Sequence, residues 1–300
     1  MKYAYNDKFS LNKVNEILKS TKVNYWSGTE GRNFEKEFSK YVGNKYSVAV
    51  SNGSVALELA LKSLNLKRND KVIVTPRSFI ISASCVINLG LKPVFSDVDR
   101  NGNLSIEGIS KAFTKSVKAI ILVHLNGLPC DMDPIVKFIK KNKIYLIEDC
   151  AQAHGAIYKN KPVGSFGDVS TWSFCQDKII STGGEGGMIS TNNKKIWMKC
   201  WSLKDHGKNY KNVFFKKHKQ GFRWLHDELG SNHRMTEIQS ALGRHQLKNL
   251  DKQLKKRNKI ANLYFKGLKN FWLTTNLIQK PNFNCSSCPI KDKKLNKCNS

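Results

Sequence analysis

From about residue 45 the chain alternates short, apolar, β-rich runs with stretches whose apolar residues recur at a helical period. The short runs predict strands over residues 46–50, 71–75, 93–98, 117–125 and 144–149. The stretches between them predict helices over residues 54–64, 79–90, 105–113 and 133–142. Alternating strands and helices require crossover connections, which predicts a mainly parallel sheet with helices on both faces.

After residue 191 the pattern becomes helical and more polar. Residues 235–268 predict a long amphipathic helix, or two helices separated by a break. The apolar positions of this segment fall near one face and are Ile238, Leu242, Leu247, Leu250 and Leu254. From about residue 274 the periodicity is weak and lysines are frequent, which is typical of a tail rather than a domain.

The charge balance is strongly basic, with 51 Lys and Arg against 23 Asp and Glu among 300 residues. Such a balance suits a protein that binds nucleic acid, or one that binds a strongly anionic small substrate. The basic residues are spread along the chain, no nucleic-acid module is visible, and Arg is scarce beside Lys. We therefore favour lysines on solvated helix faces and expect no nucleic-acid partner.

No signal for export or membrane insertion is visible, because the first 20 residues lack an apolar core and no apolar run nears the ~18 residues of a membrane helix. We expect a cytoplasmic protein without membrane contact. Five cysteines lie singly in or beside apolar segments and are predicted to be reduced, mostly buried thiols: Cys85, Cys130, Cys150, Cys175 and Cys200.

Three further cysteines lie near the end of the chain. Cys285 and Cys288 have C-x-x-C spacing, and Cys298 follows. Structural zinc sites use four ligands, usually as two pairs, and no histidine lies nearby. We therefore predict no metal site here.

Candidate chemistry first appears after the predicted strand at residues 46–50. The sequence Ser-Asn-Gly-Ser leads from this strand into a helix, with Gly53 and Ser54 at the helix start. Free backbone N–H groups and the helix dipole favour an anion at such a position, and glycine allows close approach. An ordinary Ser/Asn helix cap is the alternative.

Two more motifs follow strands. Glu148 and Asp149 end an apolar strand, where alternation lets only one of them face a ligand beyond the strand ends. A carboxylate there suits a metal ion or a protonated ring nitrogen, or it caps the next turn. Lys178 lies in a later loop before a glycine-rich run. A lysine held in such a site can trap a carbonyl group, and a solvated lysine is the alternative.

These motifs together match the needs of pyridoxal phosphate. That cofactor requires an anion site for its phosphate, a carboxylate against its pyridinium nitrogen and a lysine for a Schiff base. Phe79 follows the predicted strand at residues 71–75 and is placed to stack on the ring, or else it is a core phenylalanine.

The motifs, taken in order, resemble the DegT/StrS family of pyridoxal-phosphate-dependent nucleotide-sugar aminotransferases. The resemblance runs from about residue 25 to about residue 268. It rests on SNGSVALELAL, DKVIVTPRSFIISASCVINLGLKPVFSDVD, LVHLNGLPCDMDPI, IYLIEDCAQAHGAIYKNKPVGSFGDVSTWSFCQDKIISTGGEGGMIST and SNHRMTEIQSALGRHQLKNLDKQLKKRNKIANLY.

The resemblance implies an α/β fold of the aspartate-aminotransferase type (fold type I), with a mainly parallel seven-stranded sheet between helices and a homodimer with shared active sites. It implies ping-pong chemistry in which glutamate loads an amino group onto pyridoxal phosphate and a nucleotide-linked keto-deoxy sugar takes it, for amino-sugar and surface-polysaccharide biosynthesis. We expect a large cofactor-binding domain over 1–245, a connecting helix and start of a small domain over 246–273, and a divergent tail over 274–300.

By motif position, the resemblance implies that Lys178 is the Schiff-base lysine and later the base that moves a proton between carbon atoms. Asp149 would pair with the pyridinium nitrogen, Gln152 would lie against the cofactor, and Phe79 would stack on the ring.

The resemblance implies a second set of residues around the phosphate and substrate. Gly53, Ser54 and Ser173 would bind the phosphate. Asn232 would reach the phosphate from the partner subunit. His154 would lie near the substrate.

The chain departs from the family pattern in two places. The family often has HPTK before and at the lysine, whereas this chain has CQDK. The resemblance fades after about residue 274, where family members continue into a small C-terminal domain of the ~100-residue class. The alternative is therefore a shortened, catalytically inactive relative that still dimerises or binds cofactor. Some members carry histidine at the lysine position and catalyse dehydration, so Lys178 favours transamination.

Overall fold

The computed structural model describes residues 7–216 and 226–268. Its centre is a seven-stranded sheet in the order β1-β9-β8-β5-β4-β2-β3. Every neighbouring pair from β8 to β3 is parallel, whereas β9 runs antiparallel to both β8 and β1. The strands are β1 (Tyr46–Val50), β2 (Lys71–Val74), β3 (Lys92–Phe95), β4 (Val117–Val123), β5 (Tyr145–Asp149), β8 (Val169–Ser173) and β9 (Gly187–Thr191). The predicted mainly parallel sheet is confirmed.

The expected strand over residues 93–98 is shorter than predicted. β3 (Lys92–Phe95) pairs only with β2, and none of its four residues is fully buried. A strand at the sheet edge has only one neighbouring strand to pair with. Residues 96–98 therefore fall outside the strand, although the sequence pattern included them in it. A separate hairpin joins β6 (Ile157–Tyr158) to β7 (Lys161–Pro162).

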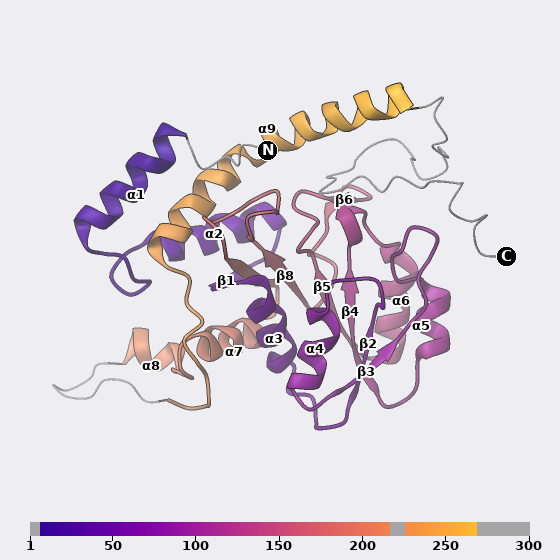
Figure 1. The fold of residues 1–300 in the computed structure, drawn as a ribbon. Helices are drawn as coiled ribbons and strands as arrows, with labels where there is room; N and C mark the ends of the chain where they lie inside the picture. Colours follow the sequence, from indigo (N-terminus) through magenta and orange to yellow (C-terminus); the bar gives the residue numbers. More distant parts are fainter. Residues whose placement is uncertain (1–6, 217–225, 269–300) are drawn as a thin grey trace.

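Helices cover both faces of the sheet, which makes three layers (Figure 1). One face, here called the α3 face, is covered by α3 (Gly53–Ser63), α4 (Ile81–Asn88) and α7 (Lys194–Lys204). The other, here called the α6 face, is covered by α2 (Glu30–Val42), α5 (Ile106–Ala112), α6 (Met132–Asn142) and the first half of α9 (Glu237–Leu268). The remaining helices are α1 (Lys8–Ser20), α8 (Tyr210–Phe215) and the short 3₁₀ helix η2 (Leu125–Gly127).

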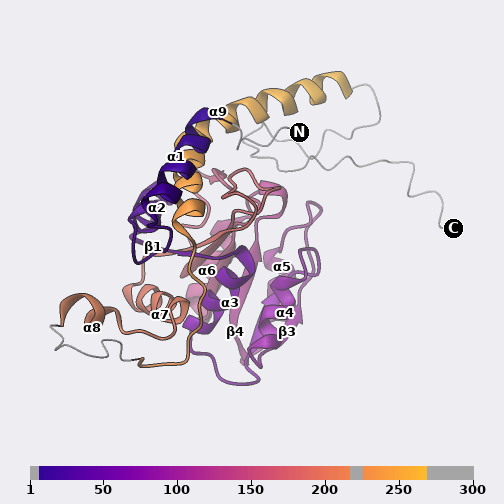
Figure 2. The ribbon, with the colours of Figure 1, turned by 60° about the vertical axis from the view of Figure 1, so that its left-hand side comes forward.

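The long amphipathic segment forms one uninterrupted helix of 32 residues, α9. In its first half, Leu247, Leu250 and Leu254 are buried against the aromatic cluster of the α6 face. Its second half extends away from the sheet (Figures 1 and 2). The helix therefore passes through the domain boundary expected after residue 245, which stays a prediction.

The start of α9 is tied to α2 by charged side chains. The Glu237 carboxylate accepts hydrogen bonds from the backbone N–H groups of Glu30 (2.5 Å) and Gly31 (3.0 Å). These groups open α2 and have no partner within that helix. Arg244 pairs with Glu30 and Glu37 on the same helix. Further along, the Gln239 side chain donates to the Glu185 carbonyl (2.8 Å), which fixes the loop between β8 and β9.

Candidate active site

The candidate site lies where the carboxyl ends of β5 and β8 meet the amino end of α3. Asp149 ends β5 and Ser173 ends β8. Asp149 is in register with Thr171, so Asp149, Thr171 and Ser173 point to the same face of the sheet by strand alternation. That face is the α3 face, because the intervening Trp172 belongs to the core on the α6 face. A parallel sheet places ligands at this edge.

The start of α3 closely approaches the end of β8. The Asn52 side chain caps the helix by accepting from the Val55 N–H (2.9 Å). A Cβ atom on Gly53 would lie 2.7 Å from the Ser173 Cβ, so only glycine fits there. The first-turn N–H groups of Gly53 and its neighbours thus lie beside the Ser173 hydroxyl, in an arrangement suited to an anion. The structure therefore brings together Gly53, Ser54 and Ser173.

The side chain of Asp149, at the end of β5, is largely buried. One carboxylate oxygen accepts from the Ala151 N–H (3.0 Å). Burial raises the pKa of the Asp149 carboxyl, while the hydrogen bond from Ala151 and the positive charge of Lys178 act in the opposite direction. A cationic group placed against this carboxylate would relieve the cost of burying its charge.

Strand alternation separates the two neighbouring carboxylates as expected. Glu148 points to the α6 face and is fully buried. Its carboxylate accepts from the backbone N–H groups of Gly164 (2.8 Å), Phe166 (2.8 Å) and Gly167 (2.6 Å), and His124 Nε2 lies 3.1 Å away. Glu148 therefore fastens the loop at residues 164–167 to the sheet and takes no part in the candidate site.

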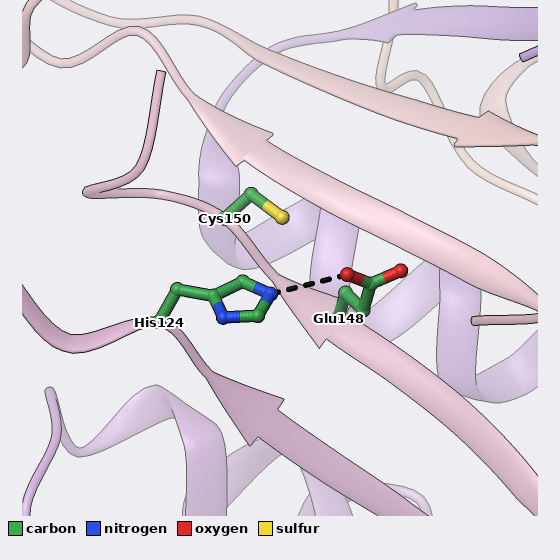
Figure 3. A group of neighbouring side chains, drawn as sticks. All are labelled: His124, Glu148 and Cys150. Carbon is green, nitrogen blue, oxygen red and sulfur yellow. Dashed lines mark hydrogen bonds and ion pairs between the residues drawn. The ribbon is translucent and has the colours of Figure 1, made fainter. Parts of the chain in front are cut away.

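The same glutamate belongs to a group of metal-ligand type (Figure 3). The ligand atoms of His124, Glu148 and Cys150 lie within 4.8 Å of one another. The Cys130 N–H donates to His124 Nδ1 (3.2 Å), so His124 Nε2 carries the proton and donates it to Glu148. Burial raises the pKa of the Cys150 thiol, which keeps it protonated. Hydrogen bonds thus satisfy His124 and Glu148 without a cation.

Replacing Glu148 with alanine should destabilise the protein by about 3–5 kcal/mol, because His124 and the buried N–H groups lose their shared acceptor. Urea unfolding monitored by tryptophan fluorescence measures this change. Glu148→Gln is the matched control and should cost less, since its one carbonyl oxygen still accepts. A loss below about 1 kcal/mol in Glu148→Ala would contradict the anchoring role.

Lys178 lies in the loop that joins β8 to β9. Its side chain is 18% exposed and its Nζ atom is 2.8 Å from Asp177 Oδ2. The positive charge of Lys178 offsets part of the rise that burial causes in the pKa of Asp149, which places the two side chains in one electrostatic neighbourhood. The loop therefore brings the partly exposed Lys178 amine into the neighbourhood of the Asp149 carboxylate.

Two buried hydroxyls near these residues have no hydrogen-bond partner among the described residues. They belong to Thr171, in register with Asp149 on the α3 face, and to Ser181, in the Lys178 loop. Buried hydroxyls are normally paired, so unpaired ones indicate a place for a polar ligand. The anion site, the carboxylate, the amine and these hydroxyls together fit pyridoxal phosphate.

Three other residues singled out from the sequence lie around this centre. Phe79 is 72% exposed and lies two residues before the start of α4. Gln152 Oε1 accepts from the Asn126 N–H (2.7 Å) and so holds the η2 turn. Asn232 is exposed and its backbone pairs with Asp205. Their implied roles toward a cofactor stay predictions.

His154 lies deeper than the other candidates. It is 1% exposed and packs against the rings of Trp172 (5.5 Å between centroids) and Phe174 (5.8 Å). Neither ring nitrogen has a partner among the described residues. Burial lowers its pKa to about 3, with a further contribution from the charge of Lys178. The expected position near the substrate stays a prediction.

His154 should make the protein sensitive to acid. Its pKa is about 3 when folded against an ordinary 6.5, so between these values only the unfolded chain binds the proton. Stability should therefore fall as the pH drops below 6.5, and His154→Leu should show a smaller fall. Melting temperatures of both proteins from pH 7.5 to pH 4 measure the difference. Parallel curves would contradict this assignment.

Comparison with known proteins places these features in a family. The family model of the DegT/DnrJ/EryC1/StrS aminotransferases matches residues 4–290. The GDP-perosamine synthase of Escherichia coli O157:H7 is 40% identical over 259 residues, which cover 85% of this chain and 67% of the relative. The chain spans 62–63% of two further GDP-perosamine synthases, from Caulobacter vibrioides and Vibrio cholerae.

Solved structures agree with this assignment. The aminotransferase from Psychrobacter cryohalolentis is 47% identical with a TM-score of 0.88, over 90% of this chain and 69% of its own. The E. coli GDP-4-keto-6-deoxy-D-mannose-3-dehydratase, solved with bound hydrated pyridoxal phosphate, is 30% identical with a TM-score of 0.81, over 93% of this chain and 74% of its own.

The fold and the site define a fold-type I protein that depends on pyridoxal phosphate. The chain belongs to the DegT/DnrJ/EryC1/StrS aminotransferase family. Within residues 7–216 and 226–268, no helix is long and apolar enough to span a membrane.

Proposed function

We propose that the protein transfers an amino group from glutamate to a nucleotide-linked keto-deoxy sugar, in the biosynthesis of an amino sugar for surface polysaccharide. The observation that supports this proposal is that Lys178 and Asp149 share one electrostatic neighbourhood and that Gly53 closely approaches Ser173 at the candidate anion site. The GDP-perosamine synthases among the relatives support a nucleotide-sugar substrate.

Each group has a distinct task in this proposal. Bound pyridoxal phosphate would supply the electron sink that makes the carbon next to the amine acidic. The first turn of α3, with Ser54 and Ser173, would bind the phosphate. Asp149 would keep its carboxylate ionised against the ring nitrogen. Lys178 Nζ would bind the cofactor covalently and, once displaced by the amino donor, would move a proton between the two carbon atoms.

The residue at position 178 decides between two reactions. The sequence pattern associates histidine at this position with dehydration, and a dehydratase is among the structural relatives. A lysine amine both forms the covalent link and carries the proton. Lys178 therefore supports transamination in this chain.

A homodimer with shared sites accounts for exposed apolar side chains near the site. Phe79 and Ile80 are 72% and 71% exposed at the start of α4, and Leu229 is 90% exposed close in sequence to Asn232. Apolar side chains gathered in this way mark surfaces that a partner covers. Asn232 would then reach the phosphate in the partner's site.

We further propose a cytoplasmic location. Four cysteines are free and buried, which suits a reducing compartment: Cys85, Cys130, Cys150 and Cys200.

Glutamate-dependent bleaching of the cofactor absorbance band tests this function. Addition of glutamate to the loaded protein should remove the band, and GDP-4-keto-6-deoxymannose or a dTDP-linked keto sugar should restore it. The alternative, an inactive relative that retains cofactor, predicts a band that glutamate leaves unchanged. No band at all after incubation with pyridoxal phosphate would refute both.

A further inference from the structure

The residues just before α9 form a segment that backbone hydrogen bonds hold on two sides. On one side, the Ser231 N–H donates to the carbonyl of Leu203, near the end of α7 (3.0 Å). On the other side, the Ser51 N–H donates to the His233 carbonyl (2.9 Å). Ser51 directly follows β1 and leads into the start of α3, where the candidate anion site lies. Residues 231–234, here called the 231–234 segment, therefore join the end of α7 to the turn before that site.

Two glycines allow the segment to lie this close to the end of α7. A Cβ atom on Gly230 would overlap the Gly207 nitrogen and would lie 2.8 Å from the Leu203 carbonyl oxygen. A Cβ atom on Gly207, whose φ is +80°, would overlap the Glu228 carbonyl oxygen. The atoms that would be overlapped belong to the backbone, so they cannot move aside as the end of a flexible side chain can. The approach of the two chain segments is therefore tightly constrained.

A buried carboxylate reinforces the same link. Asp205 directly follows α7, and its side chain is 0% exposed. Its Oδ1 atom accepts from Arg234 Nη1 (2.5 Å) and lies 3.1 Å from Lys208 Nζ. Its Oδ2 atom accepts from the indole N–H of Trp26 (2.7 Å). The carboxylate thus fastens both the 231–234 segment and the N-terminal region to the end of α7.

Arg234 connects this carboxylate to the end of β1. Its side chain is 14% exposed, and its backbone pairs with Val50, the last residue of β1. The Asp205–Arg234 pair is largely shielded from water, so removing either charge leaves the other without compensation. We expect Arg234 to move in that case, because its side chain would turn toward water. The pairing of the 231–234 segment with Val50 and Ser51 would loosen as a result.

We propose that Asp205 is a positioning residue for the phosphate of the cofactor. It holds Arg234, and through the backbone of the 231–234 segment it fixes the turn at residues 51–53. The N–H groups after that turn then face the phosphate together with the Ser173 hydroxyl. The proposal rests on the proposed function, because it takes the candidate anion site to bind the phosphate of pyridoxal phosphate. Neither Asp205 nor Arg234 was a candidate site residue in the sequence.

Binding of two cofactor forms to the full chain tests the proposal. Pyridoxamine 5′-phosphate and pyridoxamine differ only in the phosphate group, and neither has an aldehyde that surface lysines could trap. The ratio of their dissociation constants, here called the phosphate discrimination, therefore measures what the anion site contributes. A partly unfolded variant binds both compounds more weakly by the same factor, so its discrimination does not change. Fluorescence titration measures both constants.

Asp205→Asn should lower the phosphate discrimination about tenfold, the usual effect of losing one hydrogen bond to a charged group. Arg234→Gln removes the other half of the pair and should lower it by a similar factor, which keeps the proposal testable if Asp205→Asn does not fold. The double variant should lose no more discrimination than either single variant, because both changes break the same link.

Lys208→Gln is the matched control. It removes the second cation from Asp205 and leaves the contact between Asp205 and Arg234 in place. It should therefore keep the phosphate discrimination of the wild type. Unchanged discrimination in folded Asp205→Asn or Arg234→Gln protein, or an equal loss in Lys208→Gln, would overturn the proposal.

The wild-type protein separates failure of this proposal from failure of the proposed function. If the wild type binds the two compounds equally well, the candidate anion site does not bind the phosphate, and the proposed function fails. If the wild type strongly favours pyridoxamine 5′-phosphate and Asp205→Asn does so to the same extent, only the positioning role of Asp205 fails.

Discussion

Replacing Lys178 with alanine should abolish the absorbance band that the protein forms with pyridoxal phosphate and lower transaminase turnover by roughly four orders of magnitude or more. Lys178 provides both the covalent link and the proton carrier in the proposed reaction, so its removal disables both steps. The two charged neighbours of Lys178 named above, Asp149 and Asp177, are carboxylates and cannot form this link in its place. Absorbance spectroscopy and coupled turnover assays on the purified variant measure the two effects.

Lys178→Arg is the matched control for this change. Arginine preserves a positive charge beside Asp177 and Asp149 but forms no covalent link with the cofactor. It should therefore retain the fold and lose the band as completely as alanine does. A Lys178→Ala protein that keeps the band would show that another lysine holds the cofactor.

Replacing Asp149 with asparagine should reduce turnover by about 10²–10³-fold, the range seen when one preorganised electrostatic contact to a reacting system is removed. The amide cannot hold a cationic ring nitrogen, and the electron sink becomes weaker as a result. Burial raises the pKa of Asp149, so removing its charge should leave the folded state intact. Cofactor affinity and turnover are measured side by side.

Asp168→Asn provides the comparison for Asp149→Asn. Burial also raises the pKa of Asp168, whose carboxylate accepts from the Leu146 N–H (2.8 Å) just before β8. The same substitution there removes a half-buried charge at the opposite end of β8 from Ser173. Asp168→Asn should keep wild-type turnover, and equal losses in the two variants would assign the effect of Asp149→Asn to stability alone.

Local pattern was sufficient to predict which candidate residues lie at one edge of the sheet. Asp149 ends β5 and Lys178 lies in the loop after β8, and a parallel sheet collects strand ends at one edge. Alternation along β5 predicted that only one of Glu148 and Asp149 would face the ligand side, and the structure separates them in this way. Gly53 was identified by its place between a strand and a helix start.

Contacts between distant segments could not be predicted in the same way. Glu148 anchors a loop by accepting from the backbone N–H groups of Gly164, Phe166 and Gly167. Every residue type except proline has such a group, so the sequence does not show which ones will bind Glu148. His154 is buried because it packs against Trp172 of β8 and Phe174 in the loop after β8. Short-range periodicity does not report which side chains a folded chain brings together.

The alternating pattern also did not predict the direction of β9, and the structure does not describe the end of the chain. β9 follows a glycine-rich loop rather than a crossover helix, so it runs antiparallel to β8 and breaks the alternating pattern. The tail expected over 274–300 and its cysteines Cys285, Cys288 and Cys298 lie outside the described residues.

Chemical trapping tests the central claim most directly. The protein is incubated with pyridoxal phosphate, reduced with borohydride, digested and analysed by tandem mass spectrometry. We predict one modified lysine, Lys178, and loss of the modification after prior incubation with glutamate. A chain with no modified lysine, or with the cofactor fixed at a different lysine, would contradict the account.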